Sequence, residues 1–353
     1  MIEKLVRKNI RKLMPYKVNI YDDVVKLDAN ENNDLAHGFN EEIAEALLDL
    51  KINEYPDSDC WALRRQLADK LSLLPEELII GAGSDQIISI IINAFVDPGD
   101  NILTFSPTFS MYRIGTELVG GNTYEYELDS QFKLDYDGFI KKVEEDKWKI
   151  IFLTNPNNPT GGIIPRHEII RILDIANAIV VVDEAYYEFY GETVIDLIRK
   201  YPNLIVLRTL SKAYALAGAR VGYGAGSKEL LDILYRVKPP YNVTNLSQVA
   251  AKICLENQDM MMESVKKIIL EREAMEKELG SIEGIKVYES HANFLLCRIE
   301  RAKDLYEYLL ERGVLIRCFG DQGPLANCIR ITIGIADENQ LVLGIIKEFM
   351  GIK

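Results

Sequence analysis

The sequence is poor in the residues that build metal centres and disulfide frameworks. Its 353 residues include only three histidines and five cysteines. The cysteines are odd in number, and no two form a Cys-x-x-Cys pair, so neither a metal site nor a disulfide framework is expected. Scattered free thiols are typical of a reducing compartment, and we therefore expect a cytoplasmic protein.

Positive charge and long apolar runs are also scarce. Lysine and arginine number 41 against 54 acidic residues, which gives a net charge of −13. A surface of this sign repels nucleic acids and anionic membranes, so neither is expected as a partner. No run reaches the roughly 18 apolar residues of a membrane span, and the first ten residues lack the apolar core of a signal peptide.

Strand-like and helix-like segments alternate beyond residue 27. The pattern predicts a mostly parallel sheet covered by helices on both faces, an α/β three-layer sandwich. The expected strands are 78–80, 101–105, 149–154, 178–183 and 204–208, and the clearest helices between them are 85–95 and 166–177. Because ligands collect where parallel strands end, the polar residues after these strands are the candidates for chemistry.

The most informative stretch is R-T-L-S-K-A-Y-A-L-A-G-A-R-V-G-Y, residues 208–223. It places Lys212 directly after a buried strand. A lysine amine can form a Schiff base with an aldehyde when nearby cations and burial lower its proton affinity, and Arg220 supplies a cation. Thr209, Ser211 and Arg220 offer the donors that a phosphate needs. A lone Ser-Lys pair is more often a solvated surface feature, so this interpretation depends on the other motifs.

Asp183 ends the apolar run I-V-V-V. A carboxylate at the end of a buried strand is costly unless a cation pairs with it, and a protonated pyridine nitrogen is such a cation. Tyr186 follows in the same loop and could reach the ring's phenolic oxygen. The alternative for Asp183 is a helix cap.

Three further motifs follow other expected strands. G-A-G-S-D, residues 81–85, opens a helix whose terminus could bind an anion, although a plain strand-to-helix turn explains it equally well. Phe109 in F-S-P-T-F-S-M-Y could stack on a cofactor ring or be a core aromatic. Asn158 in N-P-N-N-P-T-G-G lies in a rigid turn that can aim its amide, or that is only structural.

Together these ordered motifs, with R-I-T-I-G near the C-terminus, resemble the fold-type I pyridoxal phosphate aminotransferases. The likeness covers nearly the whole chain and is greatest to the histidinol-phosphate aminotransferase group. It extends to Pro15–Tyr16, to L-D-A-N-E-N from Leu27, to Y-P-D from Tyr55, and to K-P-P-Y-N at 238–242. It implies pyridoxal 5′-phosphate as the cofactor and an aspartate aminotransferase-like large domain.

The resemblance also implies the roles of individual residues. Lys212 would hold the cofactor covalently and move the proton, with Asp183 at the ring nitrogen and Tyr186 as the third catalytic residue. The residues that it places around the cofactor are Tyr55, Gly83, Ser84, Asp85, Phe109, Asn158, Asp183, Tyr186, Thr209, Ser211, Lys212 and Arg220. Tyr55 would reach the phosphate of a neighbouring subunit, which implies a homodimer with shared active sites.

Substrate binding is assigned on the same basis to Tyr16, Asn242, Arg317 and Arg330. The expected reaction transfers the amino group of histidinol phosphate to 2-oxoglutarate, giving imidazole acetol phosphate and glutamate in histidine biosynthesis. An aromatic amino-acid aminotransferase and a threonine-phosphate decarboxylase on the same scaffold are the alternatives. After Asn32 the chain departs from the group's usual N-E-N-P-Y-G-P, which leaves the amino donor open.

A division into two domains completes these expectations. Residues 25–246 are expected to form the large cofactor-binding domain. Residues 1–24 together with 247–353 are expected to form a smaller α+β domain, with helical runs at 248–279 and 302–312 around strands at 294–299 and 329–333.

Overall fold

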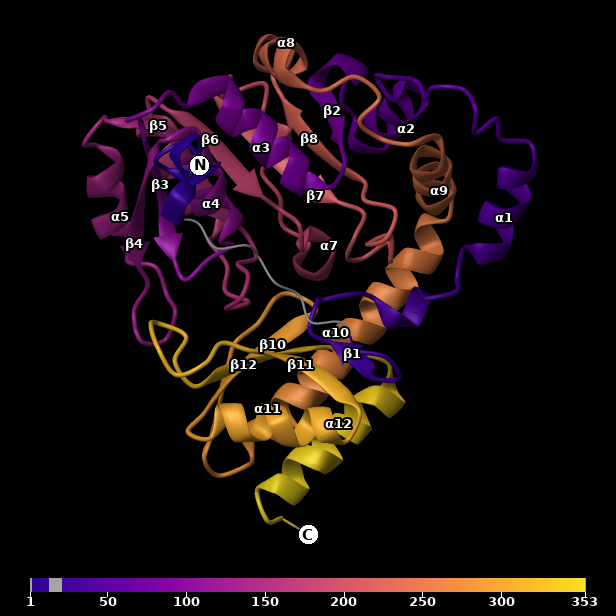
Figure 1. The fold of residues 1–353 in the computed structure, drawn as a ribbon, viewed down its shortest axis with the longest axis vertical. Coiled ribbons are helices and arrows are strands. Elements are labelled where there is room, and N and C mark those ends of the chain that lie inside the picture. The colour runs from indigo at the N-terminus through magenta and orange to yellow at the C-terminus, as the bar shows by residue number, and fades with distance from the viewer. Residues whose placement is uncertain (1, 13–20, 353) are drawn as a thin grey trace.

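Two β-sheets organise the chain in the computed structural model, which describes residues 2–12 and 21–352 (Figure 1). The larger sheet has the order β2-β8-β7-β6-β5-β3-β4, and only β8 runs against its neighbours. Its strands are β2 (Leu78–Gly81), β3 (Asn101–Ser106), β4 (Asn122–Glu127), β5 (Trp148–Thr154), β6 (Ile179–Asp183), β7 (Leu204–Thr209) and β8 (Gly222–Gly226). The predicted mostly parallel α/β sheet is therefore confirmed.

Helices cover both faces of this sheet because its central strands are apolar on both sides. Val180 and Val182 of β6 pack into one core with α2, α5 and α6, whereas Val181 packs into a second core with α3, α4 and α8. Successive strand side chains point to opposite faces, so a continuous apolar run needs cover on each side. These helices are α2 (Trp61–Leu71), α3 (Ser84–Phe95), α4 (Met111–Val119), α5 (Tyr136–Val143), α6 (Arg166–Ile175) and α8 (Lys228–Val237).

The smaller sheet has five strands in the order β1-β11-β12-β10-β9. They are β1 (Val25–Leu27), β9 (Ile285–Tyr288), β10 (Phe294–Ile299), β11 (Val314–Cys318) and β12 (Cys328–Thr332). The helices α10, α11 and α12 pack beside this sheet (Figure 1). The remaining helices are α1 (Asn40–Leu48), α7 (Tyr187–Tyr190), α9 (Asn245–Glu256), α10 (Gln258–Gly280), α11 (Ala302–Glu311) and α12 (Ala336–Phe349).

Several details differ from the sequence-based expectation, which did not include the strands β4, β9 and β11. Strand β1 pairs in parallel with β11, so residues 25–27 lie in the smaller sheet and not in the larger one. The expected helical run 248–279 is two helices, α9 and α10, that meet at Asn257. Strand β8 is a G-Y-G-A-G segment, which was not predicted because glycine disfavours strands.

No helix in the described ranges combines the length and apolar character that a bilayer crossing requires.

Candidate active site

The carboxyl ends of three neighbouring strands bring most of the predicted site residues together. Thr154 of β5 is in register with Asp183 of β6, and Asp183 is in register with Leu207 of β7. A cavity of about 170 Å³ opens at this edge. Its lining is Ser84, Asp85, Phe109, Thr154, Asn158, Asp183, Ala185, Tyr186, Thr209, Ser211, Lys212 and Arg220. Ten of the predicted residues thus share one cavity, and Thr154 and Ala185 join them.

Lys212 lies in the loop after β7, and its ammonium faces the N-terminal segment. Its Nζ donates to the Ala29 carbonyl at 2.7 Å. Burial and, to a lesser extent, the positive charge of Arg330 lower the pKa of Lys212 to about 8. A lysine with this pKa has a substantial neutral fraction near pH 8, which is the form that acts as a nucleophile or base.

Asp183 ends β6 and is only 3% exposed. Its Oδ1 accepts from the Ala185 amide at 3.1 Å and its Oδ2 accepts from the Tyr112 hydroxyl at 2.8 Å. The Tyr112 oxygen is in turn 2.9 Å from Thr154 Oγ1. Burial raises the pKa of Asp183 to about 6 despite these two donors, so a cation beside the carboxylate would be strongly favoured.

Sequence reasoning missed Tyr112, although its motif had been singled out for Phe109. A tyrosine in the first turn of α4, after a strand of the same sheet edge, was the available signal.

Close backbone approach builds the anion-binding part of the cavity at the start of α3. Gly83 has φ +78°, and a Cβ there would meet Arg220 Nη2 at 2.6 Å. A Cβ at Gly222 would meet the Ser84 amide nitrogen at 2.3 Å. The Arg220 guanidinium reaches Ser211 Oγ at 3.4 Å and Asp85 Oδ2 at 3.2 Å. Gly222 thus leaves room for the Ser84 amide, and Gly83 adopts a backbone angle that favours glycine. The resulting cradle of amides, hydroxyls and guanidinium suits a phosphate.

Tyr186 and Asn158 are both held by residues from outside the large sheet. The Asn30 Nδ2 donates to the Tyr186 hydroxyl at 2.8 Å, and Arg330 Nη1 donates to Asn158 Oδ1 at 2.5 Å. Because the Asn158 oxygen is occupied by Arg330, its amide nitrogen is left to donate into the cavity. Asn30 was missed as an individual residue, although the L-D-A-N-E-N segment had been noted.

Arg330 of β12 joins the two sheets at the cavity. Besides Asn158, it donates to the Asp28 carbonyl, and its guanidinium lies 5.3 Å from the centre of the Phe294 ring. It is 9% exposed. This placement puts a guanidinium within electrostatic reach of Lys212 and of the Tyr186 hydroxyl.

The other predicted ligand-binding residues do not line this cavity, and their roles stay predictions. Arg317 faces Arg330 across the β11–β12 pair, but it is exposed and lines a separate hollow of about 330 Å³. Asn242 donates to Gln86 Oε1 and to the Ile80 carbonyl. Tyr55 is 82% exposed and stacks on the Tyr241 ring at 4.7 Å. Tyr16 lies outside the described residues.

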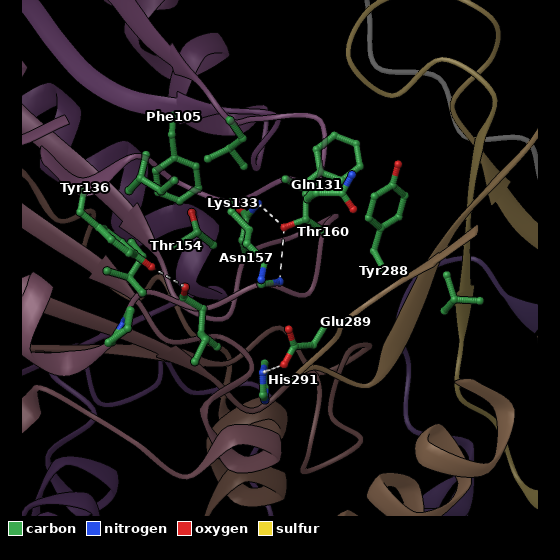
Figure 2. A pocket seen from close by; sticks show the side chains of 18 residues that line it. Phe105, Gln131, Lys133, Tyr136, Thr154, Asn157, Thr160, Tyr288, Glu289 and His291 are labelled. Carbon is green, nitrogen blue, oxygen red and sulfur yellow. Dashed lines mark hydrogen bonds and ion pairs between the residues drawn. The ribbon is translucent and has the colours of Figure 1, made fainter. Parts of the chain in front are cut away.

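A larger cavity of about 510 Å³ shares Thr154 with the first one. It lies between the 154–165 segment and residues 287–291, where His291 pairs with Glu289 at 3.4 Å (Figure 2). Neither Lys212 nor Asp183 lines it. The smaller cavity therefore holds the candidate chemistry, and the larger one is a space between the two parts of the fold.

Comparisons with known proteins agree with this geometry. The sequence matches the family description "Aminotransferase class I and II" over residues 22–344. It is 42% identical over 348 residues to a histidinol-phosphate aminotransferase of Clostridium novyi, which covers 98% of each chain.

Two solved structures have the same fold. A histidinol-phosphate aminotransferase of Sinorhizobium meliloti, in complex with pyridoxal-5′-phosphate, superposes with a TM-score of 0.90 at 24% identity, over 98% of this chain and 97% of that one. An L-threonine-O-3-phosphate decarboxylase of Porphyromonas gingivalis superposes at 0.80 with 25% identity, over 93% of this chain and 100% of that one. With a family match over most of its length and this lysine–aspartate cavity, the chain belongs to the class I and II aminotransferases.

Proposed function

We propose that this protein is a pyridoxal phosphate-dependent histidinol-phosphate aminotransferase. It would transfer the amino group of histidinol phosphate to 2-oxoglutarate, in histidine biosynthesis. One observation supports the proposal: a lysine of lowered pKa, a buried carboxyl of raised pKa and the hydroxyls and guanidinium of an anion cradle line a single cavity. The full-length similarity to relatives named for this activity favours histidinol phosphate among the possible substrates.

The residues of the cavity fit pyridoxal phosphate. The cradle of Gly83, Ser84, Ser211 and Arg220 has the donors and the space for a phosphate. Asp183 is a buried carboxyl whose ionised form needs a cation, as a protonated pyridine nitrogen would provide. When bound, this cofactor supplies an aldehyde for attachment to an amine and a ring that accepts electron density from the reacting carbon.

The protein's own groups then have distinct tasks. Lys212 would hold the cofactor through its side-chain amine and, when that amine is free, would take the proton from the substrate Cα. Asp183 would keep a proton on the ring nitrogen, while Tyr112 and the Ala185 amide orient its carboxylate. Asn158 and Tyr186 would donate to the phenolic oxygen, and Phe109 would pack against the ring face.

Anionic substrate groups would bind to Arg330. A guanidinium donates two parallel hydrogen bonds to a carboxylate or a phosphate, so one arginine can serve both the amino donor and the 2-oxo acid. Arg317, opposite Arg330 in the β11–β12 pair, would contribute a second cation if its side chain turns toward the substrate. Tyr16 and Asn242 are proposed to line the same pocket.

A threonine-phosphate decarboxylase is the second candidate, because a solved decarboxylase has the same fold. The two activities share the cofactor site and differ in which bond at Cα is broken. The purified protein is incubated with pyridoxal phosphate and 2-oxoglutarate, and with histidinol phosphate, phenylalanine, tyrosine or phosphothreonine as the amine. Glutamate and CO₂ are measured separately.

We expect glutamate formation to be fastest with histidinol phosphate and CO₂ release to be absent. CO₂ release from phosphothreonine without glutamate would assign the decarboxylase activity instead. Faster transfer from phenylalanine or tyrosine would assign an aromatic amino-acid aminotransferase. Lys212→Ala should abolish every turnover, and retained activity in that variant would overturn the mechanism.

The assembly and the domain division are also proposed. We infer a homodimer in which Tyr55 reaches the phosphate of the other subunit, because its ring is exposed and does not line the cavity of its own chain. The large domain would span about residues 28–246, once β1 is grouped with the smaller sheet. The remaining residues would form the small domain, and the protein is proposed to act in the cytoplasm.

A further inference from the structure

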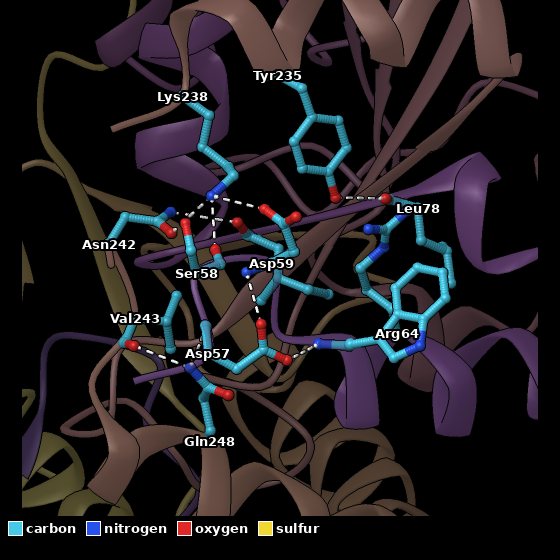
Figure 3. A network of polar contacts seen from close by, with 12 residues as sticks. Asp57, Ser58, Asp59, Arg64, Leu78, Tyr235, Lys238, Asn242, Val243 and Gln248 are labelled. Carbon is cyan, nitrogen blue, oxygen red and sulfur yellow. Dashed lines mark hydrogen bonds and ion pairs between the residues drawn. The ribbon is translucent and has the colours of Figure 1, made fainter. Parts of the chain in front are cut away.

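A buried ammonium group lies outside the cavity, at the end of α8. The side chain of Lys238 is 4% exposed, and its Nζ donates to the Ser58 carbonyl at 2.7 Å and to Asn242 Oδ1 at 3.4 Å (Figure 3). Asp59 Oδ1 is 3.7 Å away and supplies the balancing charge. Burying an ammonium costs stability, which suggests that Lys238 fixes a local conformation that apolar packing would not fix.

The hydrogen bonds that lead from Lys238 to Gln86 fix the orientation of both side-chain amides along the way. The Ala82 amide donates to Gln86 Oε1 at 2.8 Å, so this oxygen must face Ala82. The same oxygen accepts from Asn242 Nδ2 at 2.6 Å, and Asn242 Nδ2 also donates to the Ile80 carbonyl at 3.2 Å. Asn242 Oδ1 is therefore turned toward Lys238, whose ammonium can only donate.

The chain of contacts ends at the anion cradle. Ala82 lies between Gly81 and Gly83, in the turn that leads from β2 into α3. At its other end, the Lys238 ammonium holds the 57–59 loop, in which Asp57 accepts from the Asp59 and Trp61 amides. Asp57 follows Tyr55 closely in sequence, and Tyr55 stacks on Tyr241, the neighbour of Asn242. One ammonium thus connects the Tyr55 loop to the cradle.

We propose that Lys238 is a positioning residue that sets the cradle turn through Asn242, Gln86 and the Ala82 amide. This inference rests on the proposed binding of a cofactor phosphate at Gly83–Asp85. It assigns K-P-P-Y-N a role in cofactor affinity, in addition to the contact with substrate that the resemblance suggested for Asn242. Without the ammonium, the 81–83 turn samples conformations that do not bind phosphate. The apparent affinity for the cofactor is then reduced in proportion to the fraction of molecules whose turn has the binding conformation.

The test measures pyridoxal phosphate affinity of the cofactor-free protein by absorbance titration, with variants of near-equal size. Lys238→Met removes the donor, and Asn242→Asp keeps the acceptor for Lys238 but turns an oxygen against Gln86 Oε1 and the Ile80 carbonyl. Each should weaken cofactor binding about tenfold or more, the effect of one lost charged or buried hydrogen bond. At saturating cofactor, kcat and the KM for the amine of Lys238→Met should stay within about twofold of the wild type, since Lys238 is not proposed to touch substrate.

Lys228→Met on the same helix is the matched control, because Lys228 forms an exposed pair with Asp232. It should bind the cofactor as the wild type does. Wild-type affinity in Lys238→Met and Asn242→Asp would overturn the inference, as would a raised KM for the amine at saturating cofactor in Lys238→Met, which would indicate a role in substrate binding. Failure of the wild type itself to bind pyridoxal phosphate would refute the proposed function instead. Circular dichroism of each variant separates these outcomes from unfolding.

Discussion

Removing the Tyr112 hydroxyl tests the electrostatics of the candidate site directly. Tyr112 is fully buried, and its hydroxyl donates to Asp183 Oδ2 at 2.8 Å. Tyr112→Phe deletes that donor with little change in volume. The carboxylate then keeps only the Ala185 amide among the hydrogen bonds described for it.

The expected magnitude follows from the charge of Asp183. Its pKa is raised from 3.8 to about 6, so its contribution to stability is full below about pH 4 and is lost as the pH rises through about 6. The two pKa units correspond to about 3 kcal/mol. A hydrogen bond to a charged group contributes about 1.5–3 kcal/mol, and one between neutral groups about 0.5–1.5 kcal/mol. Tyr112→Phe should therefore destabilise the cofactor-free protein by about 1 kcal/mol more at pH 8.5 than at pH 5.

Urea unfolding of the cofactor-free wild type and variant at both pH values measures this difference. Tyr235→Phe is the matched control, because its hydroxyl donates to the neutral Leu78 carbonyl at 3.0 Å. Its loss of stability should be the same at both pH values. If Tyr112→Phe showed an equal loss at pH 5 and pH 8.5, the hydroxyl would not be supporting an ionised Asp183, and the reasoning would be wrong.

Two further predictions concern the cation near the lysine and the glycine of the cradle. Arg330→Met should raise the pKa of Lys212 above about 8, because the Arg330 charge lowers it. The pH dependence of the rate of cofactor attachment should therefore move to higher pH, and an unchanged pH profile would contradict this coupling. Gly83→Ala should weaken cofactor binding about tenfold or more, because its Cβ would meet Arg220 at a backbone angle of φ +78° that costs about 1–3 kcal/mol. Gly99→Ala, at φ +94° with nothing within 4 Å, carries similar strain away from the site and should leave affinity unchanged.

The main features of the fold followed from local pattern. The β-branched apolar runs that became β5, β6 and β7 predicted strands buried on both faces, and such parallel strands bring the polar residues after them together at one edge. Strand β8 could not be predicted in this way. Its glycines disfavour a strand, yet Gly222 must pack against the Ser84 amide, a contact that exists only after β2 and β8 pair.

The sequence by itself determined which chemistry the chain carries: Lys212, Asp183 and Arg220 stand in a spacing that places an amine, a carboxyl and a guanidinium at strand ends. Only the tertiary structure decided how those groups are tuned. The Tyr112 donor, the Asn30 contact to Tyr186 and the Arg330 charge beside Lys212 come from segments far apart in the chain. Hydrogen bonding and desolvation depend on distances of a few ångströms, and a sequence pattern determines such distances within a helix or strand but not between distant segments.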